Sequence, residues 1–281
     1  MKIGLVTDSP ADIPSDLAAR YGIEVVPSIV VIDGHPYMDE KDITREQFYT
    51  LLPSLKTAPT TAAPSIGDFQ TRYQKLLDAG CERVISIHTA QKLTSIAGIA
   101  QIAAADFSGK VTVLESGSLS LGLGFQALAA AEAVKEHADL AGALAAIRST
   151  RERLFVYAAL DTIEYVRRSG RVPPAVAALG GALRIKPVVE LREGLVRPMA
   201  ASRTTSQATE KLFALLKDIG SLERLAILHT NAPQRAAAFL DAVRARPHAS
   251  IPSDILVVNV TTVIGTHVGP NGLGLAAIKK G

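Results

Sequence analysis

The sequence has one cysteine, Cys81, and no tryptophan. A single cysteine cannot form an internal disulfide or build a thiolate metal cluster. This scarcity fits a reducing cytoplasm, where we expect the protein to reside. Although 48% of the residues are hydrophobic, no stretch reaches the roughly 18 uninterrupted apolar residues that a membrane span needs. We therefore expect no membrane span.

The excess of positive over negative charge is also small. The formal net charge is only +3, and Lys and Arg are interspersed with Asp and Glu. Nucleic-acid binding usually requires a basic patch or an arginine-rich run, so we expect no nucleic-acid partner.

Several nucleotide-binding and catalytic motifs are missing. The chain has no GxxxxGK[ST] phosphate loop, no GxSxG elbow and no HExxH pair. Residues 122–127 match GxGxxA, but no acidic residue ends a second strand about 20 residues later, as a dinucleotide site would require. We interpret these glycines as a place where a helix packs closely on a sheet. The sequence thus predicts no cofactor and no metal ion.

What is present predicts an α/β protein with two domains. Buried strands alternate with helices between residues 3 and 151, which is typical of a parallel sheet covered by helices on both faces. The later part of the chain adds a hairpin to helices and strands, which predicts an α+β domain with a mixed sheet. We expect domains at 1–155 and 156–281, with a ligand site between or beside them.

Local signals predict several element boundaries. Glu24 to Ile32, rich in Val and Ile, is predicted as one strand that ends at an Asp33-Gly34 hairpin turn. Polar residues stand where helix caps are expected: Asp12 or Ser15, Thr44 and Ser65.

The segment from Ile264 to Gly274 is the most distinctive, because it places His267 among four glycines directly after an apolar run. Glycine lets a ligand approach the main chain closely, and histidine can carry a proton near neutral pH. The alternative interpretation is a tight turn with a surface histidine.

Hydroxyls and cations extend this candidate set. Thr61 and Thr94 are each expected at the entry to a helix, where free amides favour an anion. Arginine suits a carboxylate or phosphate because its guanidinium is a rigid fork. Each threonine can equally be a helix cap and each cation a surface charge, and sequence spacing leaves open whether they converge. Three cations stand beside glycine, proline or hairpin breaks: Arg171, Lys186 and Arg203.

Together these motifs resemble the DegV family, the fatty-acid-binding subunits of bacterial fatty acid kinase. The resemblance runs along the whole chain in ordered segments, which makes it more specific than any single motif. These segments are residues 7–14, 61–65 with 68–69, 116–124, 168–172, 185–187 and 263–270.

The resemblance implies a two-domain α/β protein that holds a long-chain fatty acid with its tail in a buried tunnel. It assigns the carboxylate to Thr61 and Thr94. Ser95 is the alternative second donor, because two additional residues precede this motif and Thr94 replaces its usual serine. Ser116 and Gly269 fall in further expected ligand-binding segments.

The resemblance also implies a partner. A separate subunit resembling dihydroxyacetone kinase would supply ATP and transfer its γ-phosphoryl group to the bound carboxylate, and the acyl phosphate would enter phospholipid synthesis. His267, Arg171 and Arg203 are expected to serve the phosphorylated head group or the encounter with the kinase. The chain is not expected to catalyse a reaction alone.

Two other functions remain open from the residues. One is a stand-alone phosphotransferase or small-carbonyl enzyme that uses His267 as an acid–base or covalent group. The other is a regulatory module that binds a lipid or another apolar metabolite without phosphorylation.

Overall fold

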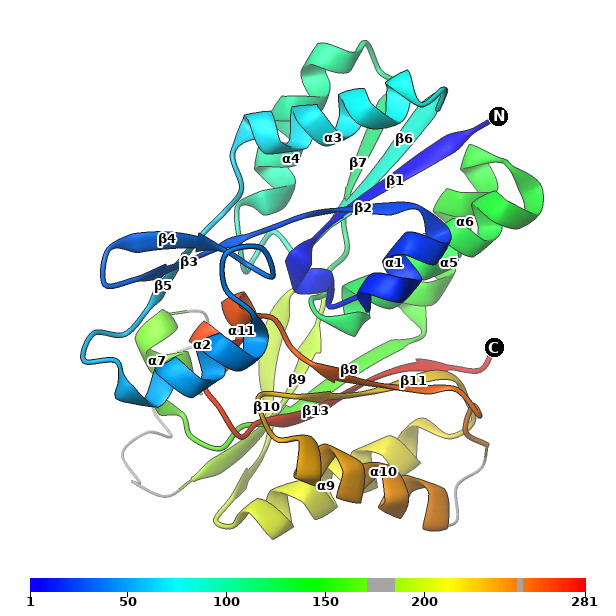
Figure 1. Cartoon of the computed structure of the whole chain (residues 1–281). Helices are drawn as coiled ribbons and strands as arrows, with labels where there is room; N and C mark the ends of the chain where they lie inside the picture. The colour runs from blue at the N-terminus through cyan, green and yellow to red at the C-terminus, as the bar shows by residue number, and fades with distance from the viewer. Residues whose placement is uncertain (171–184, 247–249) are drawn as a thin grey trace.

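The computed structural model describes residues 1–170, 185–246 and 250–281, and it is built from stacked layers (Figure 1). From top to bottom in Figure 1 these are two helices, a four-stranded sheet, a middle layer of helices, a six-stranded sheet and a final pair of helices. A three-stranded sheet projects from one side.

The four-stranded sheet is entirely parallel, with strand order β2-β1-β6-β7. Its strands are β1 (Ile3–Asp8), β2 (Ile23–Val26), β6 (Arg83–His88) and β7 (Val111–Glu115). The helices around it are α1 (Ser15–Tyr21), α3 (Ile66–Asp78), α4 (Ile96–Ala104), α5 (Leu121–His137) and α6 (Leu140–Glu152).

Successive side chains of a strand point to opposite sides of a sheet. Because these strands carry apolar side chains on both sides, helices cover both faces of the sheet. Val6 and Val84 pack with side chains of α3 and α4, whereas Leu5 and Ile85 pack with those of α5. The predicted parallel sheet with helices on both faces is confirmed.

The six-stranded sheet has the order β10-β9-β8-β13-β11-β12. Only β11 and β12 run parallel, so the predicted mixed sheet is confirmed. One face packs on α9 (Thr205–Ile219) and α10 (Pro233–Ala245), and the other on α5. Its strands are β8 (Leu154–Ala159), β9 (Lys186–Arg192), β10 (Leu195–Ser202), β11 (Leu222–His229), β12 (Ile255–Asn259) and β13 (Leu273–Lys279).

The three-stranded sheet has the order β4-β3-β5, and α2 (Arg45–Leu51) packs beside it. Its strands are β3 (Ile29–Ile32), β4 (His35–Met38) and β5 (Thr60–Ala62). The prediction of one strand over Glu24 to Ile32 is wrong: β2 ends at Val26 and β3 begins in another sheet. Pro27 lies at this break, and proline has no N–H to donate to a ladder.

The hairpin turn and two of the three helix caps predicted from the local sequence are confirmed, and one cap is not. The Asp33-Gly34 turn joins β3 to β4 with positive φ at both residues, as a two-residue hairpin turn requires. Thr44 and Ser65 both cap their helices as expected, and each does so in a capping box. The expected cap at Asp12 or Ser15 is wrong, because α1 begins after Pro14 without a side-chain cap.

The glycines of the GxGxxA stretch lie in α5, which begins at Leu121. A Cβ on Gly122 would lie 2.7 Å from Cγ2 of Val156, and one on Gly124 would lie 2.6 Å from the carbonyl oxygen of Ala11. The close-packing interpretation of this motif is therefore confirmed.

One hydrophobic core crosses the expected domain boundary. It contains Leu5 of β1 and Leu121 of α5 together with Val156 of β8 and Ile278 of β13. The division at residue 155 stays a prediction. No helix in the described ranges is long and apolar enough to cross a membrane.

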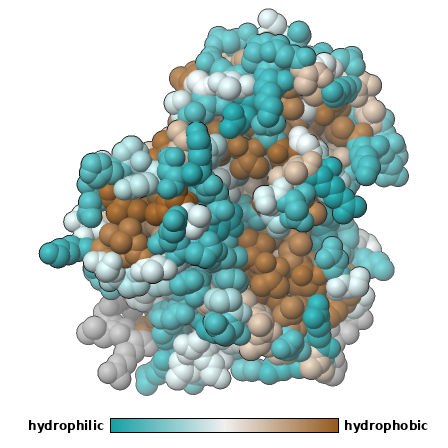
Figure 2. All heavy atoms as spheres, in the orientation of Figure 1, coloured by the Kyte–Doolittle hydropathy of each residue, from teal (hydrophilic) through white to brown (hydrophobic). Residues whose placement is uncertain are grey.

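The edge strand β12 carries the exposed side chain of Val257, and apolar atoms show on the surface in this region (Figure 2). Two short helices, α7 (Glu164–Ser169) and α11 (Thr262–Val268), and three 3₁₀ helices complete the described elements. The 3₁₀ helices are Ser9–Ala11, Leu52–Ser54 and Ala105–Phe107.

Candidate functional site

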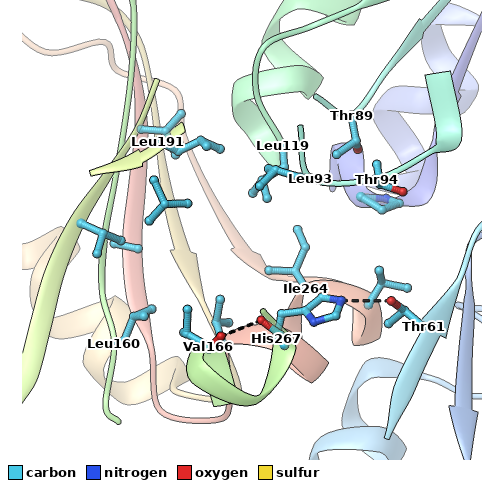
Figure 3. Close-up of a pocket in the computed structure, with 18 of the residues that line it drawn as sticks. Thr61, Thr89, Leu93, Thr94, Leu119, Leu160, Val166, Leu191, Ile264 and His267 are labelled. Atoms are coloured by element: carbon cyan, nitrogen blue, oxygen red, sulfur yellow. Dashed lines mark hydrogen bonds between the residues drawn. The ribbon is translucent and has the colours of Figure 1, made fainter. Parts of the chain in front are cut away.

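An apolar cavity of about 160 Å³ lies where segments that follow strands of the four-stranded sheet meet strands of the other two sheets (Figure 3). Most of its lining is aliphatic, from β8, β9, α7 (Glu164–Ser169), α11 (Thr262–Val268) and the loop before α4. Five polar side chains join this lining: Thr61, Thr89, Thr94, Ser169 and His267. The described part of the lining contains no Lys or Arg.

Thr61 and His267 form a hydrogen-bonded pair at the cavity. The hydroxyl oxygen of Thr61 lies 3.0 Å from Nε2 of His267, and the two side chains point toward each other in Figure 3. Thr61 lies within β5 and not at the entry to a helix, so that expectation is wrong. The two residues that the resemblance placed at one head group are thus adjacent in space.

The segment around His267 differs from the predicted loop. Residues 262–268 form the helix α11, with His267 in its last turn, and only the residues after it form the glycine-rich connection to β13. Gly269 has φ of +76°. Its missing side chain makes room for Tyr165, since a Cβ there would lie 2.3 Å from Cδ2 of the ring. Gly269 therefore shapes the end of α11 and does not line the cavity.

Two buried carboxylates hold the start of α11. Oδ1 of Asp12 accepts a hydrogen bond from the amide of Thr261 at 2.8 Å. Oδ1 of Asp39 accepts from the amide and the hydroxyl of Thr262, at 3.1 and 2.6 Å. Arg45 lies 3.4 Å from Asp12 and balances part of this negative charge. The helix that carries His267 is thereby fixed to two distant parts of the chain.

Burial has an electrostatic consequence at Asp12. Because the carboxyl is fully buried, its pKa is raised to about 6, although Arg45 and the hydrogen bonds from Ser120 and Thr261 act in the opposite direction. Burial likewise raises the pKa of Tyr49, whose hydroxyl donates to the carbonyl oxygen of Val260.

The opposite wall is formed by the loop between β6 and α4. Thr89 lines the cavity, and Asp8 fixes it by accepting from its hydroxyl at 2.7 Å and from its amide at 2.9 Å. Asp8 also lies 3.0 Å from Nδ1 of the buried His88. Sequence reasoning missed Thr89. Its place directly after a buried strand was the available signal, since sites in parallel sheets lie at carboxyl strand ends.

Thr94 and Ser95 differ in position. Thr94 lines the cavity, whereas Ser95 precedes α4, is exposed and is not among the lining residues. Of these two residues, Thr94 is therefore the one whose hydroxyl can join Thr61 in contacting a ligand in the cavity.

The remaining predicted residues that the structure describes do not line the cavity. Ser116 is buried and exchanges hydrogen bonds with the main chain of Ser118. Arg203 is exposed at the end of β10, and Lys186 is paired with Asp161 at 2.6 Å. Arg171 lies outside the described residues.

The arrangement suits a ligand with an apolar body and one small polar end. Such a body would contact Leu93, Leu119 and Leu191, which lie around the cavity in Figure 3. Its polar end would meet the hydroxyl and imidazole groups. No group of three or more His, Cys, Asp or Glu side chains forms a metal-binding cluster within residues 1–170, 185–246 and 250–281.

Comparison with known proteins gives a consistent result along the chain. The family model described as DegV, an uncharacterised protein family, matches residues 2–280. A DegV domain-containing protein of Streptomyces coelicolor is 32% identical over 282 residues, which cover 99% of each chain.

Solved structures match equally well. A DegV family protein from Thermus thermophilus, described by its fatty acid binding, has a TM-score of 0.92 at 33% identity and full coverage of both chains. DegV of Bacillus subtilis, described as a fatty acid binding protein, has a TM-score of 0.88 at 28% identity, again with full coverage.

Proposed function

The chain belongs to the DegV family, and on that basis we propose that it binds a long-chain fatty acid in the cavity beside Thr61 and His267. One observation carries this proposal: a hydrogen-bonded hydroxyl–imidazole pair stands at the edge of a cavity that is otherwise almost wholly aliphatic. The fatty acid binding described for the relatives from Thermus thermophilus and Bacillus subtilis supports it.

The two ends of a fatty acid make different demands, and this cavity offers both kinds of contact. Each buried methylene contributes about 0.8 kcal/mol to binding, which the aliphatic walls supply. The carboxylate must keep hydrogen-bond donors when it leaves water. Thr61 on one wall and Thr94 on the other are within the same lining and supply such donors.

Beyond binding, we propose that the protein presents the carboxylate to a separate ATP-binding kinase subunit. The sequence supports this because it lacks a GxxxxGK[ST] phosphate loop of its own. His267 would stabilise the charge that develops on the transferred phosphoryl group, as cations do in phosphoryl transfer. The exposed Arg203 would contact the partner.

Fatty acid binding is tested by extracting the purified protein and analysing the extract by mass spectrometry. We expect a fatty acid to be released. The delipidated protein should then bind palmitate but bind hexadecanol, which has the same chain length and no carboxylate, at least about tenfold more weakly, since a hydrogen bond to a charged group contributes about 1.5–3 kcal/mol. An empty extract together with no palmitate binding would contradict the proposal.

Phosphorylation needs a separate test. Acyl phosphates react with hydroxylamine, so the palmitate-loaded protein is incubated with ATP and hydroxylamine, with and without a dihydroxyacetone-kinase-like subunit. We expect a hydroxamate only when both proteins are present. Product without the second protein would favour the stand-alone phosphotransferase, and no product in either case would favour a lipid-binding module.

A further inference from the structure

A second apolar cavity of about 100 Å³ adjoins the first. The two cavities share a wall of small and aliphatic side chains: Leu119, Val156, Ala158, Leu160, Ile264 and Val268. The second cavity extends between β8, β11 and β13, away from Thr61 and His267, neither of which lines it.

The size of the first cavity makes this neighbour important. A cavity of about 150 Å³ holds a molecule the size of benzene, and the first cavity, at about 160 Å³, is of that size. A long acyl chain cannot fit in such a space alone. It needs more apolar volume, and the adjoining cavity provides it directly behind the shared wall.

Ala158 is the smallest side chain in that wall. It lies in β8, an interior strand of a sheet covered on both faces, yet it is only partly buried, whereas the next residue, Ala159, is 1% exposed. Because Ala158 lines both cavities, its exposed surface faces them.

The residue opposite Ala158 is also small. Gly274 of β13 pairs with Ala158, and a Cβ on this glycine would lie 3.6 Å from Cβ of Ala158 and 2.9 Å from the carbonyl oxygen of Tyr157. Because both residues are small, the surface of the sheet leaves room at this point for an acyl chain to pass over it.

We propose that residue 158 determines the length of acyl chain that the protein accepts, because the chain passes over Ala158 from the first cavity into the second. This inference rests on the proposed fatty acid binding. A short chain ends in the first cavity and does not pass over Ala158 into the second, while a long chain fills both.

The test compares decanoate with stearate on delipidated wild-type protein and on Ala158→Leu, by calorimetry or native mass spectrometry. Each methylene changes the Kd by about fourfold, so excluding a few of them from the second cavity should weaken stearate binding by more than about tenfold. Decanoate binding should change by less than about threefold on the same reasoning. Ala158→Gly is the matched control, because it adds no side-chain volume at residue 158. It should retain the wild-type preference for chain length.

A second variant guards against a folding defect in Ala158→Leu. Leu228 lines only the second cavity, so Leu228→Ala enlarges that cavity and should shift the preference toward chains longer than stearate. Equal weakening of decanoate and stearate in Ala158→Leu, or an unchanged length preference in both variants, overturns the inference. Failure of the wild-type protein to bind either acid overturns the proposed function instead.

Discussion

The hydroxyl oxygen of Tyr49 lies 2.4 Å from where a Cβ on Gly265 would stand. The helix α11 therefore rests directly on the Tyr49 ring of α2, with glycine as the contact point. We expect Gly265→Ala to displace α11 and to lower the free energy of unfolding by about 1–3 kcal/mol, as overpacking of a core does.

Chemical denaturation of Gly265→Ala, Tyr49→Phe and the double variant checks this contact. Tyr49→Phe alone removes the hydrogen bond to Val260 and should cost about 1 kcal/mol. In the Gly265→Ala background the same change should cost less, because it also removes the closest atom of the clash. Strictly additive effects would show that the two residues do not compete for space.

The Thr61–His267 pair predicts a division of roles. Thr61→Ala should raise the Kd for palmitate about 10- to 100-fold, because a hydrogen bond to a carboxylate contributes about 1.5–3 kcal/mol. His267→Ala should retain palmitate but yield no hydroxamate with the kinase subunit. Thr60→Ala changes an exposed neighbour on the same strand and should leave both properties unchanged. Equal loss of binding in Thr61→Ala and His267→Ala would mean that this division is wrong.

Asp12 predicts an unusual pH dependence of stability. Burial raises its pKa from 3.8 to about 6 in the folded protein, so the folded state binds this proton more tightly than the unfolded state. The contribution of Asp12 to stability is therefore greatest below about pH 4 and falls as the pH rises to about 6, by about 3 kcal/mol in total.

Unfolding of wild type and Asp12→Asn between pH 4 and 7 isolates this effect, because the other carboxylates cancel in the difference. Wild type should lose stability relative to Asp12→Asn as the pH rises. Glu210 provides a contrast, because its hydrogen bond with Arg246 lowers its pKa. Its contribution is therefore present at neutral pH and lost as the pH falls through its folded pKa. A difference between wild type and Asp12→Asn that is constant with pH would refute the prediction for Asp12.

Removing the buried hydroxyl of Thr89 should lower the free energy of unfolding. Thr89→Val leaves Oδ1 of the buried Asp8 without the hydroxyl that donates to it. We expect a loss of about 1–3 kcal/mol in unfolding free energy, the usual cost of an unsatisfied buried acceptor. Thr89→Ser keeps the donor and should recover most of this loss. If serine were no better than valine, the effect would come from packing and not from the hydrogen bond.

Sequence reasoning succeeded where the determining contacts are local. The capping boxes at Thr44 and Ser65 each close within three residues, and the Asp33-Gly34 turn needs only the backbone freedom of its own residues. The parallel and mixed sheets followed from the spacing of strands and helices, which is also visible in the sequence.

It failed where the contacts are distant. The sequence of α11 resembles a loop because Gly265 lies within it and Gly269 follows it directly. The hydrogen bonds that hold its start come from Asp12 and Asp39, 249 and 223 residues away. The pairing of Thr61 with His267 spans 206 residues. Only the family resemblance could suggest that pairing, and nothing in the local pattern pointed to Thr89.

The position of β13 within the six-stranded sheet has a consequence for protein synthesis. This strand follows every other strand of the sheet in the chain, yet it lies between β8 and β11. The ribosome must therefore release residues 273–279 before the sheet can close, and α11 with His267 emerges only shortly earlier. Because Leu273 and Gly274 of β13 line the second cavity, that cavity cannot form until translation has passed this last strand.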